Sequence, residues 1–280
     1  EVLVKVSHCG ICHSDLTVVD MPGGGQLPQV LGHEAAGEVV EVGMGVTRLK
    51  KGDRVMLSPL PTCGVCYFCN RNQPALCIEG QSFMLGTRAD GTSPLSRNGE
   101  LVYQAFGLGG WGEYATINER RAIKVDDDTP LEIVCVIGCA VQTGVGAVLN
   151  TAQVEEGATV LVTGLGGIGV SIVQGARLAN ASKIIVSDPV AERRDYAANF
   201  GATHVLDPTQ DDVVAKAIEL TGGVGVDYAF DGAGHEKLIA DCLAATRSGG
   251  TTTMVGAALG QFEMPIPAMF LMQEKKLQGC

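Results

Sequence analysis

Four cysteines lie close together in the chain, as Cys63-x-x-Cys66-x-x-Cys69 followed by Cys77. A tight loop with two-residue gaps can turn such thiols toward one point, and four thiolates with no open position make a structural zinc set. The spacing therefore predicts a zinc-holding knuckle over residues 63–77. Chance burial of four unrelated thiols in so short a segment is the weaker interpretation.

An iron–sulfur cluster is the sharper alternative, because bacterial ferredoxins also open with cysteines separated by two residues. In that pattern the fourth cysteine follows after three residues and precedes a proline. Here seven residues separate Cys69 from Cys77, and Ile78 follows. An iron–sulfur electron-transfer protein is thus the alternative from another functional class, and its visible absorption would identify it.

Composition excludes several classes of protein. The 280 residues carry a formal net charge of −11 without a Lys/Arg cluster, which argues against nucleic acid because phosphates would be repelled. The most apolar stretch, residues 133–149, is interrupted by glycines and Gln142, so we expect no membrane span. Ten cysteines, several in metal-type spacing, favour a reducing cytoplasm.

The texture of the sequence changes near residue 140. Before it, short β-like runs such as 38–42 and 52–56 are separated by Gly and Pro, which predicts an irregular, mostly β domain at 1–140. After it, strand-like and helical runs alternate, which predicts a doubly wound parallel sheet at 141–280. The expected strands of this second domain are 160–163, 184–187, 204–206, 226–230 and 252–255, and the expected helices are 168–180, 191–200, 213–220 and 235–245.

A glycine-rich turn, Gly164-Leu165-Gly166-Gly167-Ile168-Gly169, follows the strand-like run 158–163 and opens a helix. This context gives the motif meaning: the first glycine permits a tight turn, the second lets backbone N–H groups approach a pyrophosphate, and the last allows close helix–strand packing. Asp188 stands nineteen residues after Gly169, at the end of the next expected strand. The two features together predict a dinucleotide site.

The charge at Asp188 predicts NAD as the cofactor. A carboxylate hydrogen-bonds the free ribose hydroxyls of NAD and repels the additional phosphate of NADP. The next three residues offer no cation for that phosphate. Arg193 and Arg194 lie about a turn and a half further along, where a cation could still contact the cofactor, so NADP stays open.

Three dispersed segments carry further metal-type residues: Cys9-Gly-Ile-Cys12-His13-Ser14-Asp15, Gly32-His33-Glu34 and Gly138-Cys139. Taken alone, Cys9 and Cys12 could form a redox pair, and Cys139 could be a small buried hydrophobe. With the knuckle and the glycine turn, however, they occur in the order and approximate spacing of the zinc-dependent medium-chain alcohol dehydrogenases. The chain resembles that family over essentially its whole length, and residues 78–110 resemble its longer-insert branch.

The resemblance implies a GroES-like, mostly β catalytic domain, a Rossmann domain and two Zn²⁺ ions per chain. It makes Cys12, His33 and Cys139 the ligands of a catalytic zinc whose fourth position is left to substrate. Glu34 would lie behind this metal, and Asp15 would hydrogen-bond the ligand histidine.

The resemblance also implies roles in cofactor binding and proton transfer. Ser14 would pass the alcohol proton toward the ribose, His13 would contact the pyrophosphate, and Thr143 and Ile168 would flank the nicotinamide. Members of the family often carry a histidine at position 17, where the proton relay reaches the surface. This chain has Thr17, which cannot titrate near neutral pH.

The implied reaction is hydride transfer between a small-molecule alcohol and NAD, or from NADH to an aldehyde or ketone in reverse. We expect a homo-oligomer, with a dimer favoured, and an apolar pocket lined by Phe106. A rival substrate is a hydroxymethyl adduct of glutathione or mycothiol, for which Arg88 and Arg97 are the candidate cations. A third hypothesis is a structural or regulatory member of the family that binds nucleotide without turnover.

The ends of the sequence predict that family segments are missing. The chain opens inside the alternating run Val2, Val4, Val6 and ends at Cys280 without a capping segment. We therefore expect it to lack the N- and C-terminal segments of the family.

Overall fold

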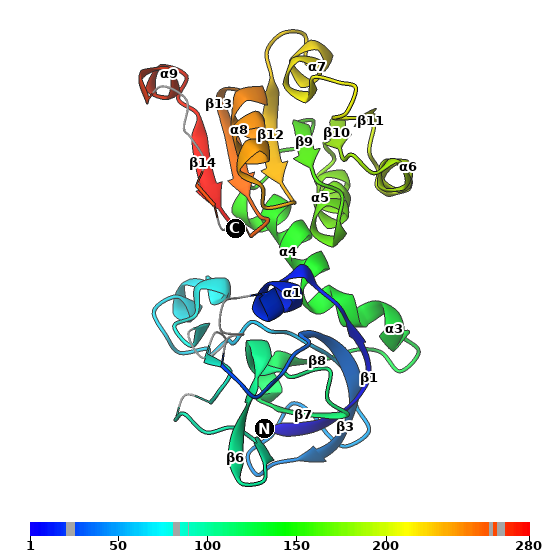
Figure 1. Ribbon diagram of the computed structural model, residues 1–280, viewed down its shortest axis with the longest axis vertical. Coiled ribbons are helices and arrows are strands. Elements are labelled where there is room, and N and C mark those ends of the chain that lie inside the picture. Colours follow the sequence, from blue (N-terminus) through cyan, green and yellow to red (C-terminus); the bar gives the residue numbers. More distant parts are fainter. Residues whose placement is uncertain (21–25, 81–84, 89, 258–259, 262–266) are drawn as a thin grey trace. The chain divides into compact units, whose positions relative to one another are not determined.

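The computed structural model describes residues 1–20, 26–80, 85–88, 90–257, 260–261 and 267–280. The chain divides into two compact units, Glu1–Cys139 and Ala140–Cys280. Each unit has its own sheet and its own buried apolar cluster (Figure 1).

The first unit is mostly β, and it runs from blue to green in Figure 1. Its strands are β1 (Val2–Gly10), β2 (Gln29–Val30), β3 (Glu34–Val42), β4 (Arg54–Leu57), β5 (Leu95–Arg97), β6 (Glu100–Gln104), β7 (Tyr114–Ile117) and β8 (Ala122–Lys124). Its α-helices are α1 (His13–Asp20) and α3 (Leu131–Val134), and its 3₁₀ turns are Cys69–Arg71, Pro74–Leu76, Ala105–Gly107, Glu119–Arg121 and Cys135–Gly138. Within the described residues, an antiparallel sheet of order β7-β1-β3-β4-β8 and a smaller sheet β2-β6-β5 carry this unit.

The pairing of β1 with β3 positions the segments that matter most for function. Gly10, the last residue of β1, lies opposite Glu34, the first residue of β3. Gly37 allows the close approach, because a Cβ there would lie 2.1 Å from the carbonyl oxygen of Lys5. Val4 of β1 and Val39 of β3 are fully buried, and each contributes about 1.5–3 kcal/mol. The loops that follow β1 and precede β3 therefore meet at one edge of the sheet.

The second unit confirms the predicted parallel sheet, and it runs from green to red in Figure 1. Its strands are β9 (Thr159–Thr163), β10 (Lys183–Ser187), β11 (His204–Leu206), β12 (Val226–Asp231), β13 (Thr246–Met254) and β14 (Lys276–Gly279). Its helices are α4 (Ala140–Gly146), which continues into the π-helical segment Ala147–Thr151, α5 (Gly167–Leu178), α6 (Ala191–Phe200), α7 (Val213–Leu220), α8 (Glu236–Ala245) and α9 (Pro267–Met272). Among the described residues the strand order is β11-β10-β9-β12-β13-β14, which reverses direction at β9. Ligands of such sheets bind outside the carboxyl ends of the strands at this reversal.

Local sequence signals explain why these helices begin and end where they do. The side chain of Asp212 accepts a hydrogen bond from the Ala215 N–H at 3.0 Å and caps α7. Gly201, with a φ of 122°, ends α6 in a conformation that disfavours other residues. Gly144 lets α4 pack closely on α5, because a Cβ there would lie 2.6 Å from the carbonyl oxygen of Ile168.

Among the described residues, no single helix is long and apolar enough to cross a membrane. The two helical segments Leu131–Gly138 and Ala140–Thr151, which are bent at the break between them, are together long and apolar enough for a span by length and composition alone.

Candidate active site

Four donor groups converge in the first unit. The donor atoms of Cys12, His33, Glu34 and Cys139 all lie within 4.8 Å of one another. The β1–β3 pairing explains the first three, because Cys12 follows β1 while His33 and Glu34 stand at the start of β3. More than a hundred residues of chain separate this loop pair from Cys139.

Gly138 brings Cys139 to the set. A Cβ at position 138 would lie 2.1 Å from the carbonyl oxygen of Leu57, at the end of β4. Only glycine permits this backbone contact, and the next residue is thereby held near β3 and β4. The Gly-Cys pair of the sequence is thus a packing requirement as well as a motif.

A buried carboxylate orients the histidine. Asp15 is 0% exposed, and its Oδ1 lies 3.2 Å from Nδ1 of His33. The same carboxylate accepts hydrogen bonds from the N–H groups of Gly32 at 3.0 Å and Cys12 at 3.2 Å. This arrangement favours the tautomer with the proton on Nδ1, which leaves Nε2 with a lone pair for a metal. Although burial raises it, these hydrogen bonds hold the pKa of Asp15 below its ordinary value.

The pKa values of the three candidate ligands depend on one another, because their side chains are hydrogen-bonded. A hydrogen bond from the Cys139 thiol, opposed by burial and aided by His33 and Ser14, lowers the pKa of Cys12 to about 3. Burial disfavours a charged His33, but hydrogen bonds with Asp15 and Cys12 raise its pKa to about 9. The neighbouring Cys12 thiolate and burial raise the pKa of Cys139. A metal ion entering this set replaces protons, which is the chemistry of a zinc site.

Glu34 completes the cluster. It is 4% exposed, and its charge contributes to the raised pKa of Cys139. A Cβ at Gly10 would lie 2.4 Å from Oε2 of Glu34, so glycine at this position leaves room for the carboxylate.

The knuckle cysteines form a second set. The sulfur atoms of Cys63, Cys66, Cys69 and Cys77 also lie within 4.8 Å of one another. Backbone N–H groups of the same loop point at them: Cys66 N–H lies 3.3 Å from Sγ of Cys63, and Cys63 N–H lies 3.3 Å from Sγ of Cys77. Backbone donation from Cys69 and Ile78 lowers the pKa of Cys66 to about 6. A cluster of four thiols fits a closed structural zinc, in which all four ligands come from the protein.

The proton-relay candidates lie on α1. Oγ of Ser14 is 3.7 Å from Sγ of Cys12. The hydroxyl of Thr17 donates to the carbonyl oxygen of His13 at 3.0 Å, one turn back along the helix. The His13 side chain is exposed.

In the second unit, the glycine turn has the geometry that its sequence predicts. Gly164 has a φ of 81°, and a Cβ there would lie 2.7 Å from Cβ of Ala233. A Cβ on Gly169 would lie 1.8 Å from the carbonyl oxygen of Gly164. Helix α5 begins at Gly167 with Gly166 as its N-cap, so the N–H groups of Gly167 and Ile168 lie at a helix N-terminus.

Asp188, the residue after β10, contacts the backbone of this turn. Its carboxylate is 2% exposed and accepts hydrogen bonds from the N–H groups of Leu165 at 2.7 Å and Val190 at 2.8 Å. Nη1 of Arg193 lies 3.5 Å from the same carboxylate, and this arginine side chain is 52% exposed. Thr143 is half-buried on α4.

Comparison with known proteins identifies the family of the chain. Residues 1–127 match the alcohol dehydrogenase GroES-like domain family, and residues 167–280 match the zinc-binding dehydrogenase family. S-(hydroxymethyl)glutathione dehydrogenase of Synechocystis sp. is 39% identical over 284 residues, covering 100% of this chain and 77% of the relative. The chain belongs to the zinc-dependent medium-chain dehydrogenase family.

Two solved structures of this family are similar to the whole chain. The alcohol dehydrogenase zinc-binding domain protein from Burkholderia ambifaria is 38% identical with a TM-score of 0.94. Benzyl alcohol dehydrogenase from Acinetobacter calcoaceticus is 34% identical with a TM-score of 0.91. Each comparison covers 100% of this chain and 76% of the other. Family membership confirms a dehydrogenase that uses zinc and a nicotinamide cofactor, and it favours zinc over an iron–sulfur cluster in the knuckle.

Sequence reasoning missed one aromatic residue next to the loops that carry the candidate ligands Cys12 and His33. The indole Nε1 of Trp111 donates to the carbonyl oxygen of Gly10 at 3.3 Å. A Cβ on Gly32 would lie 2.4 Å from Cδ1 of the same ring. Trp111 thus packs across the two loops that carry Cys12 and His33. The sequence signal that could have indicated a close contact here is the pair of glycines, Gly10 and Gly32, shortly before the two predicted ligands.

We predict that Asp15→Asn weakens zinc binding at the Cys12–His33–Cys139 set by about 10–100-fold. The amide keeps one oxygen acceptor but presents an NH₂ group to one of the present donors, and it leaves His33 less basic. Chelator competition with metal analysis measures the affinity, and Asp20→Asn, an exposed residue of the same helix, is the control. Equal zinc affinity in the two variants would contradict the role of Asp15.

We predict that Cys66→Ser removes one zinc and lowers the melting temperature by about 5–15 °C, because binding energy of a structural zinc is folding energy. The zinc held by the other set should remain. Metal analysis and thermal unfolding measure both effects, with Cys280→Ser as an exposed-cysteine control. A variant that keeps its melting temperature but loses turnover would show that the knuckle is not structural.

Proposed function

We propose that this dehydrogenase oxidises a primary alcohol to its aldehyde with NAD as the hydride acceptor, and reduces the aldehyde in reverse. The observation that supports it is the convergence of Cys12, His33 and Cys139 beside Glu34. Two thiols and one imidazole leave a fourth tetrahedral position for substrate, as catalytic zinc sites do.

Bound zinc supplies a Lewis acid that polarises the substrate oxygen, and bound NAD accepts the hydride. The chain's own residues hold the metal and direct protons. Cys12, Cys139 and Nε2 of His33 are the proposed ligands, and Asp15 fixes the histidine ring through Nδ1. Glu34 supplies a negative charge beside them.

Ser14 is the proposed first acceptor of the alcohol proton, because its hydroxyl lies in the first turn of α1 next to Cys12. Thr17 cannot store this proton. Its hydroxyl donates into the helix, so only its oxygen lone pairs are left to guide a water molecule. We propose that His13, Thr143 and Ile168 contact the cofactor.

The substrate class follows from the surface beside the zinc ligands. The ring of Phe106 lies with its centroid 4.3 Å from that of His33, tilted by 51°. An aromatic side chain at this place favours an apolar substrate, and stacking with an aromatic alcohol adds about 0.5–1.5 kcal/mol. Among the relatives, the benzyl alcohol dehydrogenase bears a name of this substrate class.

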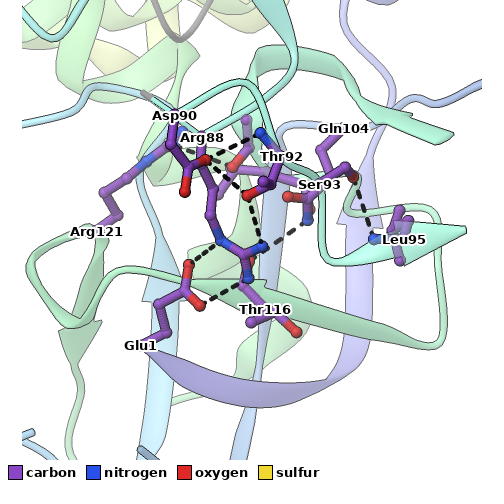
Figure 2. A network of polar contacts seen from close by, with 11 residues as sticks. Glu1, Arg88, Asp90, Thr92, Ser93, Leu95, Gln104, Thr116 and Arg121 are labelled. Atoms are coloured by element: carbon purple, nitrogen blue, oxygen red, sulfur yellow. Dashed lines mark hydrogen bonds and ion pairs between the residues drawn. The ribbon is translucent and has the colours of Figure 1, made fainter. Parts of the chain in front are cut away.

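A hydroxymethyl thiol adduct is the second candidate substrate, because the Synechocystis relative is named for it. Such an anionic adduct needs cations. Figure 2 shows Arg88 engaged with Glu1, through Nε and Nη2 at 2.8 Å each. This ion pair offsets the charge of Arg88, and Arg97 lies exposed at the end of β5. The apolar alcohol is therefore the stronger candidate.

We propose NAD over NADP because Asp188 is buried against the glycine turn. The additional 2′-phosphate of NADP would lie beside this carboxylate, with Arg193 as the neighbouring cation.

A dimeric assembly and a cytoplasmic location stay predictions. Light scattering and cell fractionation test them.

We predict two zinc ions per chain and NAD reduction in the presence of benzyl alcohol. Cys139→Ala should lose one zinc and at least about 10³-fold in kcat/KM, because polarisation of the substrate oxygen is worth several kcal/mol. Cys242→Ala, a buried cysteine of the second unit, is the control. Full zinc content with undiminished turnover in Cys139→Ala would overturn the ligand assignment. A higher kcat/KM for S-(hydroxymethyl)glutathione than for benzyl alcohol would replace the substrate.

We predict that Asp188→Asn lowers the preference for NAD over NADP by roughly ten- to a hundredfold, the effect of losing hydrogen bonds to a charged group. The asparagine oxygen can still accept an N–H of the turn, so folding is retained. Steady-state kinetics with both cofactors measure the ratio, and Asp195→Asn on the exposed side of α6 serves for comparison. An unchanged ratio would mean that Asp188 does not face the ribose.

A further inference from the structure

Arg121 is a buried cation of the first unit. It is 9% exposed, and burial lowers its pKa to about 10, so it stays protonated at neutral pH. Within the described residues its guanidinium donates hydrogen bonds to four backbone carbonyl oxygens and to no carboxylate. Figure 2 labels the side chain in the same view as the network of Glu1 and Arg88.

The four carbonyl groups belong to two separate segments. Nε and Nη2 reach the oxygens of Ser58 at 3.1 Å and Pro59 at 2.7 Å, directly after β4. Nη2 and Nη1 reach the oxygens of Phe106 at 2.6 Å and Gly107 at 3.0 Å, in the turn after β6. One planar group therefore joins these segments. Lysine, with a single nitrogen, cannot make the same four bonds.

The turn that Arg121 holds is conformationally unusual. Phe106 has a φ of 54° and a ψ of 21°, the left-handed region that side chains other than glycine disfavour. Gly107 follows with a φ of 61°, and a Cβ there would lie 2.5 Å from Nη1 of Arg121. Strained residues of this kind persist where surrounding contacts enforce them, and they gather at functional sites.

Both segments touch residues of the metal site. The ring of Phe106 lies 4.3 Å from the ring of His33. On the other side, the carbonyl oxygen of Leu57, one residue before Ser58, lies against Gly138, which precedes Cys139.

We propose that Arg121 is a positioning residue of the active site, which holds the Phe106 ring against His33 and so sets the apolar surface that substrate meets beside the metal. This inference rests on the proposed function for its substrate part. The competing view is that Arg121 stabilises the fold alone. That view predicts lower stability with no change in substrate selectivity or in the metal environment.

Arg121→Lys in the intact enzyme tests the proposal, with Arg54→Met as the matched control. Within the part of the chain that the structure describes, Arg54 also binds two backbone carbonyls, those of Asp127 and Thr129, and no carboxylate. We expect Arg121→Lys to lower the kcat/KM ratio of benzyl alcohol to ethanol by about five- to tenfold, chiefly through KM for benzyl alcohol. It should keep two zinc ions. Arg54→Met should lower the melting temperature and leave the ratio unchanged.

A double-mutant cycle identifies Phe106 as the intermediary. In a Phe106→Ala background, Arg121→Lys should have no further effect on the selectivity ratio, because coupled residues are not additive. Additive effects, or an unchanged ratio in Arg121→Lys, would overturn the proposal. Should the arginine variant fail to fold, Phe106→Ala alone decides: an unchanged selectivity ratio in that variant contradicts the proposal.

The visible spectrum of the cobalt-substituted enzyme separates this inference from the proposed function, because it reports the metal environment without turnover. We expect the ligand-field bands to shift in Arg121→Lys and in Phe106→Ala but not in Arg54→Met. Shifted bands in a protein that oxidises no alcohol would remove the proposed function and support the positioning role. Identical bands in all variants would overturn the positioning role.

Discussion

The buried carboxylate of Asp15 is the interaction on which the active site depends. It receives N–H donors from Cys12 and Gly32 and from the ring of His33, so it ties the loop after β1 to the loop before β3. A buried charge without partners costs several kcal/mol, which means that all three donors must be in place together. The β1–β3 pairing delivers them, since Gly10 and Glu34 face each other at the sheet edge. The strand pairing and the Asp15 carboxylate thus bring the candidate ligands Cys12 and His33 together.

The parts of the chain that could be predicted from residues alone are those whose physics is local. The knuckle cysteines lie within one loop, and the glycine turn lies between one strand and one helix, so their spacing alone indicates their geometry. Helices α6 and α7 begin and end at the predicted residues, because a cap at Asp212 and a glycine at 201 act within one turn. The parallel sheet followed from the regular alternation of such elements.

The candidate active-site ligands could not be found in this way. Cys12, His33 and Cys139 are brought together by strand pairing and by the contact of Gly138 with Leu57, which no local pattern encodes. Resemblance to a family supplied them instead. Neither local patterns nor the family resemblance predicted the contacts of Arg121, because its partners are backbone carbonyls that every sequence possesses. The hydrogen bond from the Thr17 hydroxyl to the backbone could not be predicted either, since a threonine hydroxyl can bond to a helix carbonyl or to water.

The two cysteine sets are stabilised by different neighbours, and this difference decides how each responds to change. In the knuckle, N–H groups of the same loop lower the pKa of Cys66 to about 6, so its thiolate depends on local backbone geometry. In the active site, the Cys139 thiol and the His33 ring lower the pKa of Cys12 to about 3, so its thiolate depends on groups from distant segments. A shift of one segment therefore changes the distances among all three candidate ligands at once. The ring of Phe106 contacts one of these candidate ligands, His33. Under the proposed role of Arg121, its hydrogen bonds fix the segment after β4 relative to the turn after β6, whereas the knuckle cysteines lie within one loop.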